Sequence, residues 1–185
     1  MSPATEAAST PASNGLPALR RVITEHDTDG KPIINKTLSQ IPPYISPPGL
    51  HLCLGYSLEE SPAILENDQD LKAYQDRLPH NVDLSIHGGT VLRIVDFLPG
   101  VEAPMHRTAT VDFGVMMEGE VQLILGSGET TVLKRGDIIV QRGTIHAWKN
   151  NSTTEPARGF FVLMDAELPT VNGTKLVEEI PSLEQ

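Results

Sequence analysis

Short runs of apolar residues, each closed by a glycine turn, fill the chain from Gly89 to about residue 165. Runs that recur every ~8–12 residues, with turns between them, are typical of antiparallel strands. The runs are TVLRIVDFL (90–98), VDFGVMM (111–117), EVQLIL (120–125), TTVLK (130–134), DIIVQ (137–141), IHAWKN (145–150) and GFFVLM (159–164). The pattern predicts an all-β barrel or sandwich over residues 89–165, without internal repeats of the solenoid or propeller kind.

The chain before Gly89 has a different pattern. Residues 1–18 are Ser, Thr, Ala and Pro with almost no large apolar side chain, so we expect a disordered tail. RRVIT (20–24) and KPIIN (31–35) flank Asp29-Gly30 and predict a hairpin. A Pro-rich connector then leads to a predicted strand, LHLCLGY (50–56).

One helix is predicted in this part, with a second short turn before it. Leu71, Tyr74 and Leu78 recur at helical spacing within residues 69–78, Asp68 is the expected N-cap, and Pro79 ends the run. The predicted organisation is a tail (1–18), an arm with strands and one or two short helices (19–88), a barrel core (89–165) and a C-terminal extension (166–185).

Composition excludes several classes of function. Fourteen basic and twenty-four acidic residues give a net charge of −10, which disfavours nucleic acid and anionic membranes as partners. The single cysteine, Cys53, excludes an internal disulfide and a cysteine-based zinc site. No apolar run approaches the roughly 18 residues of a membrane helix, and the first residues lack the features of a targeting peptide. We expect a cytoplasmic protein that binds neither nucleic acid nor membrane.

Two segments carry polar residues at fixed distances from glycines. In the first, PGVEAPMHRTATVDFGVMMEG, five residues separate Gly100 from His106 and six separate Asp112 from Gly119. The second is RGDIIVQRGTIHAWKN, with matching positions Gly136, Gly143, His146 and Asn150. In these residues and their order the chain resembles the cupin superfamily. The resemblance spans residues 89–165 and implies a single-domain double-stranded β-helix, or jelly-roll barrel.

The departures from the cupin pattern bear on metal binding. Thr108 stands where the family has its second metal-binding histidine, Asp112 replaces a glutamate, and Gln141 replaces a proline. A typical cupin metal has three histidines and a carboxylate, so at most His106, Asp112 and His146 remain. Two imidazoles and a carboxylate can hold non-haem Fe(II), yet an aspartate is one methylene shorter than a glutamate. Both outcomes therefore stay open: a divalent metal (Fe, Zn, Mn or Ni), or no cofactor.

The same residues could act without a metal. Strand alternation places His106, Thr108 and Asp112 on one face, toward the barrel interior. Burial there displaces pKa values and permits acid–base chemistry, so we predict His106, Asp112 and His146 as catalytic residues. The residues predicted to line the substrate pocket are Thr108, Phe113, Met116, Gln141 and Trp148, although the parity of Phe113 points it outward.

Longer strings, among them HRT, DFG, EGEV and GDIIVQRGTIHAW, resemble one subgroup. It consists of small single-domain fungal cupin oxidoreductases encoded beside polyketide synthases in salicylaldehyde-type pathways. This resemblance implies a planar aromatic or polyketide substrate and an oxidation, dehydration or cyclisation. Two alternatives remain: a metal-independent dehydratase, isomerase or cyclase that uses His/Asp chemistry, and a non-catalytic small-molecule-binding or storage cupin. We also expect a homodimer in which residues 20–56 pack across the two-fold axis.

Overall fold

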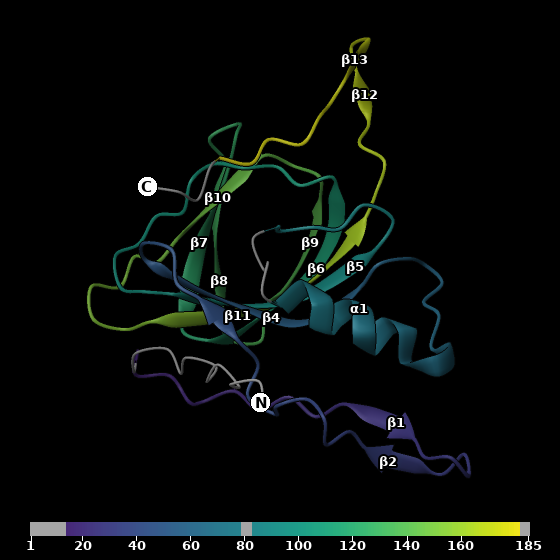
Figure 1. Ribbon diagram of the computed structural model, residues 1–185. Helices are drawn as coiled ribbons and strands as arrows, with labels where there is room; N and C mark the ends of the chain where they lie inside the picture. Colours follow the sequence, from purple (N-terminus) through teal and green to yellow (C-terminus); the bar gives the residue numbers. More distant parts are fainter. Residues whose placement is uncertain (1–13, 79–82, 182–185) are drawn as a thin grey trace.

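The computed structural model describes residues 14–78 and 83–181, and Figure 1 shows strands arranged around a common interior. Residues 1–13 of the predicted tail lie outside the described residues. The end of that segment contacts the barrel: Asn14 Nδ2 donates to Asp96 Oδ2 at 2.7 Å. Arg158 Nη1 donates to the carbonyl of Pro17 at 2.6 Å. Contact with the barrel therefore begins earlier in the chain than the sequence predicts.

Two antiparallel sheets form the barrel, which confirms the predicted all-β fold class. The larger sheet has the strand order β3-β4-β5-β11-β6-β9. Its strands are β3 (Tyr44–Ile45), β4 (Leu50–Leu58), β5 (Thr90–Phe97), β11 (Ala157–Asp165), β6 (Thr110–Glu118) and β9 (Ile138–Arg142). The smaller sheet, in the order β10-β7-β8, comprises β10 (His146–Lys149), β7 (Glu120–Leu125) and β8 (Thr130–Lys134). Figure 1 shows β7 and β10 on the opposite side of the interior from β5 and β6.

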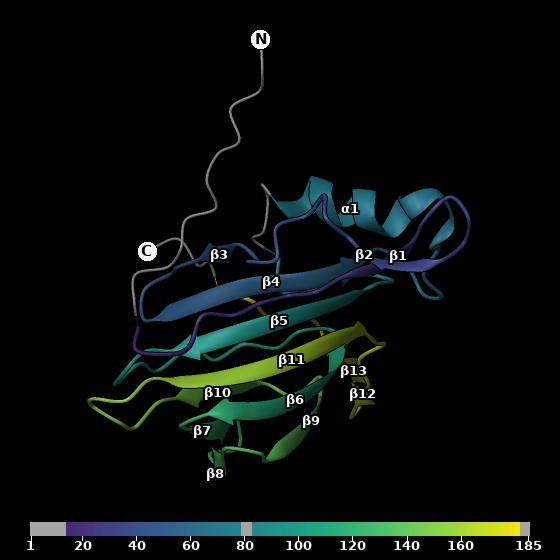
Figure 2. The ribbon, with the colours of Figure 1, turned by 90° about the horizontal axis from the view of Figure 1, so that it is seen from below.

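β4 is an integral strand of the larger sheet, as Figure 2 shows. It pairs along its length with β5 of the same chain, from Leu50↔Phe97 to Leu58↔Thr90. The strand predicted over residues 50–56 is therefore present, and its backbone hydrogen bonds extend the sheet of its own barrel. Packing of residues 20–56 across a two-fold axis stays a prediction.

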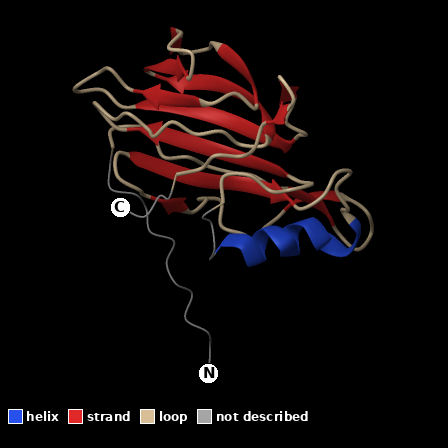
Figure 3. Cartoon of the chain, turned by 90° about the horizontal axis from the view of Figure 1, so that it is seen from above, coloured by secondary structure: helices blue, strands red, loops and turns tan. Residues whose placement is uncertain are grey.

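Smaller elements surround the sheets. The predicted hairpin is present as β1 (Thr24–His26) and β2 (Pro32–Ile34). A 3₁₀ turn, η1 (Glu66–Asp68), leads into α1 (Gln69–Arg77), which Figure 3 shows beside the sheet. A hairpin of β12 (Thr170–Val171) and β13 (Thr174–Lys175) lies in the C-terminal extension. Asp68 is the N-cap residue of α1, as predicted, but it adopts a left-handed conformation with φ 57° and makes no side-chain capping bond.

α1 covers the outer side of β4. Its buried residues are Leu71 and Tyr74, and the Tyr74 hydroxyl donates to the carbonyl of Leu54 at 2.9 Å. A large buried side chain of this kind contributes ~1.5–3 kcal/mol through removal of apolar surface from water. Among the described residues, no helix has both the length and the apolar character to cross a bilayer.

Candidate functional site

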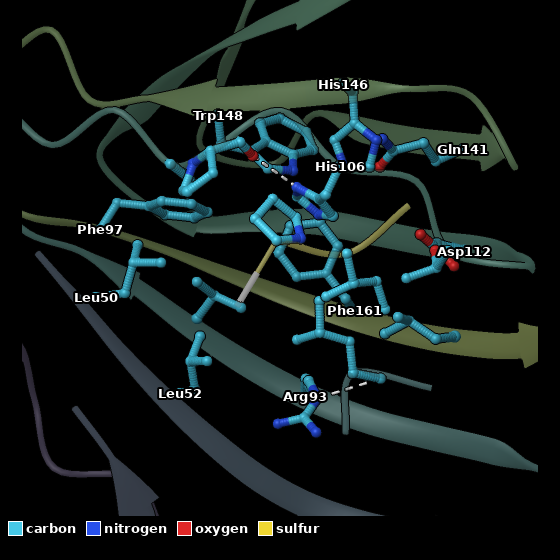
Figure 4. Close-up of a pocket in the computed structure, with 18 residues that line it drawn as sticks. Leu50, Leu52, Arg93, Phe97, His106, Asp112, Gln141, His146, Trp148 and Phe161 are labelled. Carbon is cyan, nitrogen blue, oxygen red and sulfur yellow. Dashed lines mark hydrogen bonds between the residues drawn. The ribbon is translucent and has the colours of Figure 1, made fainter. Parts of the chain in front are cut away.

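A pocket with apolar walls lies between the two sheets, inside the barrel. It encloses about 810 Å³ of space, its open mouth included. β4, β5 and β11 provide the apolar wall: Leu50, Leu52, Val95, Phe97, Phe161 and Leu163. Polar side chains gather on the other side, as Figure 4 shows for His106, His146, Gln141 and Asp112 opposite Leu50, Leu52 and Phe97.

The two predicted histidines are direct neighbours. His106 lies in the segment before β6 and His146 begins β10, and their backbones form a reciprocal antiparallel bridge. The two N–H···O bonds measure 2.8 and 2.9 Å, and the ring centroids lie 4.3 Å apart. Gly143 permits the turn between β9 and β10: its φ is +58°, and a Cβ at this position would lie 2.3 Å from Leu168.

Backbone carbonyls fix the tautomer of both imidazoles. His106 Nδ1 lies 2.9 Å from the carbonyl of Pro104, and His146 Nδ1 lies 2.9 Å from the carbonyl of Thr144. A carbonyl oxygen can only accept, so Nδ1 must carry the proton in each neutral ring. The Nε2 atom of each ring therefore keeps its lone pair, available as a proton acceptor or a ligand.

Both rings are neutral at physiological pH. Burial is the main cause that lowers the pKa of His106, and the hydrogen bond to Pro104 opposes it. Burial, together with the nearby His106, lowers the pKa of His146 to about 4. Two adjacent neutral imidazoles can thus accept a proton but hold one only weakly.

Asp112 lies on β6 and lines the same pocket. Burial raises its pKa to about 6, and a hydrogen bond from Thr110 partly opposes this effect. Thr110 Oγ1 also lies 2.6 Å from Thr108 Oγ1, so Thr108 donates to Thr110 while Thr110 donates to Asp112. The other carboxylate oxygen, Asp112 Oδ1, is buried and has no hydrogen-bond partner. A carboxyl group with a pKa near 6 can exchange protons close to neutral pH.

The structure does not bring three metal ligands together. Within residues 14–78 and 83–181, no group of three or more His, Cys, Asp or Glu side chains could hold a metal ion. Asp112 therefore does not join His106 and His146 as a third ligand. The donor set falls short of the three protein ligands of a mononuclear catalytic site, and a bound metal stays a prediction.

The other predicted pocket residues divide into two groups. Thr108, Gln141 and Trp148 line the pocket. Phe113 and Met116 do not: Phe113 is 49% exposed on the outer face of β6, and Met116 is 2% exposed in the core. Their assignment to the pocket is wrong. Side chains on β6 alternate between the two faces of the sheet, so Phe113 points outward. Met116 points inward but packs in the hydrophobic core instead of lining the cavity.

Trp148 anchors an aromatic cluster at the pocket wall. Its ring centroid lies 6.2 Å from that of Phe97, 5.8 Å from that of Phe161 and 5.9 Å from that of His146. These separations are typical of favourable aromatic contacts. The cluster offers flat apolar surface beside the imidazole pair.

Sequence reasoning missed several lining residues. Arg93 shares its strand face with Val95 and Phe97, so strand alternation could have found it. Its guanidinium donates to the carbonyl oxygens of Leu84 and Asp83, and burial lowers its pKa to about 10. Ile180 and Pro181, from the C-terminal extension, also line the pocket, and no local pattern could have indicated this.

The fold and the pocket are those of a cupin. The family model described as a cupin domain matches residues 93–163, and the relatives below are similar over most of the chain. This chain belongs to the cupin family, which confirms the resemblance seen in its motifs.

The relatives are fungal biosynthesis proteins. Oryzines biosynthesis cluster protein J from Aspergillus oryzae is 43% identical over 169 residues, 89% of this chain and 93% of the relative. Phomopsin biosynthesis cluster protein C' from Diaporthe leptostromiformis is 41% identical over 84% of this chain and 83% of the relative. Cupin-domain-containing oxidoreductase virC from Hypocrea virens is 36% identical over 88% of this chain and 85% of the relative.

Proposed function

We propose that this protein is a small cupin enzyme of secondary metabolism. Its substrate is a planar, aromatic or pre-aromatic intermediate such as a polyketide, and its reaction is an oxidation, dehydration or cyclisation inside the barrel pocket. The names of the relatives, which refer to biosynthesis clusters and to oxidoreductases, support the metabolic setting.

The observation that carries this proposal is the pair of adjacent neutral imidazoles in an apolar pocket. His106 and His146 stand 4.3 Å apart by ring centroid, each with its Nε2 lone pair available. A general base must be unprotonated at the working pH and close to the proton that it removes. The depressed pKa of His146, about 4, meets the first condition over the whole neutral range.

Other residues that line the pocket would hold the substrate and exchange a proton with it. Phe97, Trp148 and Phe161 provide flat apolar walls for a planar ring. Asp112, with its pKa of about 6, exchanges a proton with substrate near neutral pH. An imidazole would remove a C–H proton from the substrate. Return of that proton to another atom completes an isomerisation, and its delivery to a departing hydroxyl group releases water in a dehydration. In a cyclisation the carbanion attacks a carbonyl carbon of the same molecule, and the proton goes to the carbonyl oxygen.

Among these reactions, the names of several relatives favour an oxidation. An oxidation removes two electrons, which His and Asp side chains do not accept, so it needs a separate electron acceptor. The product distinguishes the candidates: an oxidation removes two hydrogen atoms, a dehydration removes water, and an isomerisation leaves the mass unchanged.

The test begins with the compound that accumulates in the host when the gene is deleted. Purified native protein is incubated with this compound, and products are followed by mass spectrometry before and after treatment with a chelator, with metal analysis of the same sample. We expect the native protein to convert the compound and the His106→Ala/His146→Ala variant to lose at least ~100-fold in rate.

The matched control is His87→Ala, because the His87 side chain is 99% exposed. It should leave the rate unchanged. Conversion that survives the double histidine substitution would overturn the proposed role of the pair. A native protein that binds the compound without converting it would indicate a binding or storage cupin instead.

A further inference from the structure

Two buried polar atoms in the pocket lack partners, and they lie on paired strands. Asp112 on β6 and Gln141 on β9 are direct cross-strand neighbours in the sheet register. Asp112 is 6% exposed and Gln141 is 4% exposed, and both line the pocket. Asp112 Oδ1 and Gln141 Nε2 make no hydrogen bond. An acceptor and a donor are therefore both unsatisfied in the same part of the cavity.

Such atoms are costly to bury. A buried polar group without a partner loses its hydration and regains nothing, so the great majority of such groups in native proteins are satisfied. Residues directly opposite in an antiparallel pair have Cα atoms about 4.5–5.5 Å apart. A ligand group that binds between the two side chains would satisfy both atoms.

The chemistry of the two atoms defines that group. Gln141 Nε2 is a donor and requires an acceptor on the ligand, while Asp112 Oδ1 is an acceptor when ionised and requires a donor. A carbonyl next to an N–H or O–H group satisfies both, as in a primary amide, a lactam or a phenol beside a carbonyl.

We infer that Asp112 and Gln141 form a polar subsite that recognises adjacent acceptor and donor groups on one edge of a planar ligand. The ring packs against Trp148 and Phe161, and the polar edge points to β6 and β9. The inference rests on the proposed function, because the ligand enters the same pocket. It adds a specificity that the imidazole pair alone does not provide.

Three naphthalene probes of similar shape test the subsite at pH 7.5. 2-Naphthamide carries acceptor and donor, 2-acetylnaphthalene carries the acceptor alone, and 2-isopropenylnaphthalene carries neither. Binding is followed by the fluorescence of Trp148, which is the only tryptophan in the sequence and lines the pocket. We expect the amide to bind about tenfold more tightly than the ketone, and the ketone about tenfold more tightly than the hydrocarbon.

Two near-isosteric variants separate the contributions. Gln141→Met removes the donor, so it should abolish the difference between ketone and hydrocarbon. Asp112→Leu removes the acceptor, so it should abolish the difference between amide and ketone. Gln122→Met is the matched control: Gln122 lies on β7 outside the pocket, where it accepts from Asn151, and its substitution should preserve the order of affinities.

Thermal unfolding separates recognition from a structural role. Because Gln141 Nε2 is unsatisfied, Gln141→Met should keep or raise the unfolding temperature. A lowered unfolding temperature would mean that Gln141 supports Asp112 internally, and it would overturn the subsite.

Equal binding of all three probes by the native protein would also overturn the subsite, while leaving the aromatic pocket intact. Failure of every probe to bind would contradict both the subsite and the proposed planar substrate. If the probes bind in the expected order but the native protein does not convert the accumulated compound, only the enzymatic proposal is contradicted.

Discussion

At the scale of single residues, burial decides which form each titratable group adopts in the pocket. His146 is 3% exposed and its ring faces His106 and Trp148, so the charged form is disfavoured. Asp112 is 6% exposed and is likewise driven toward its neutral form. These shifts connect the pocket to the stability of the protein, because a group that titrates differently in the folded and unfolded states makes unfolding depend on pH.

His146 should make the protein sensitive to mild acid. Its pKa falls from 6.5 to about 4 on folding, so the unfolded state binds the proton more tightly. The contribution of the neutral ring is present above pH 6.5 and is lost as the pH falls toward 4, by about 3 kcal/mol in all. Denaturant unfolding between pH 7 and 4 should show a smaller loss of stability for His146→Gln than for the native protein. The same slope in both proteins would contradict this prediction, and His87→Gln serves as the exposed control.

Asp112 should act in the opposite direction. Its pKa rises from 3.8 to about 6 on folding, so its ionisation destabilises the folded state progressively between these values. Asp112→Asn removes that penalty and should raise the free energy of unfolding above pH 6 by up to about 3 kcal/mol, with no gain near pH 4. Denaturant unfolding at the two pH values measures the difference. A loss of stability at pH 7.5 would show that the carboxylate is compensated in the folded protein.

The residue pattern predicted which side chains face the barrel interior, but not how close to one another they lie. Strand alternation correctly directed Thr108 and Asp112 inward and Phe113 outward. It could not show that His106 pairs with His146 while Asp112 does not join them in a group of three ligands, because that arrangement depends on how the two sheets pack. The sequence also could not show that both Nε2 atoms keep a lone pair, because this follows from the bonds of each Nδ1 to the carbonyls of Pro104 and Thr144.

At the scale of elements, a buried ion pair connects the two central strands of the larger sheet. Asp96 on β5 and Arg158 on β11 are register partners, 0% and 4% exposed, and their two hydrogen bonds measure 2.5 and 2.7 Å. The same two side chains bind Asn14 and the carbonyl of Pro17. The ion pair therefore binds the segment that contains Asn14 and Pro17 to the outer face of the sheet.

Breaking this pair should be costly. Asp96→Asn leaves the Arg158 guanidinium buried without its counter-charge, and we expect a loss of about 3–5 kcal/mol in unfolding free energy, measured by denaturant unfolding. Asp96→Asn/Arg158→Met should recover part of this loss, because the second substitution removes the stranded charge. Asp76→Asn on the exposed side of α1 is the control. An equal loss in single and double variants would mean that the interaction is not a matter of charge compensation.

The elements that the sequence predicted are those with local signals. Alternating apolar residues between glycine turns located the strands from β5 to β11, and helical spacing located α1. β4 has the same strand signal, yet its position in the sheet depends on pairing with β5, more than thirty residues further along the chain. The contact of Ile180 and Pro181 with the pocket is also long-range, so the sequence predicted only that a C-terminal extension follows the barrel.

At the scale of the whole molecule, two apolar areas of the described surface are candidates for an interface. One is the β1–β2 hairpin, where Ile33 is 40% and Ile34 46% exposed. The other is the outer face of β6 and the edge strand β9, where Phe113 is 49%, Val140 55% and Ile138 75% exposed. A net charge of −10 opposes close approach of two copies, so an interface requires apolar area to offset that repulsion.

We predict a homodimer in which a second copy covers the hairpin, within the segment 20–56 that the sequence singled out. Light scattering should give twice the mass of one chain for the native protein. Ile33→Asp/Ile34→Asp places two charges on the hairpin and should yield a monomer with unchanged circular dichroism. Ile138→Asp introduces a charge on the other area and should remain dimeric. If Ile138→Asp alone dissociates the dimer, the edge strand β9 forms the interface, because a free sheet edge and an exposed apolar face then meet the partner together.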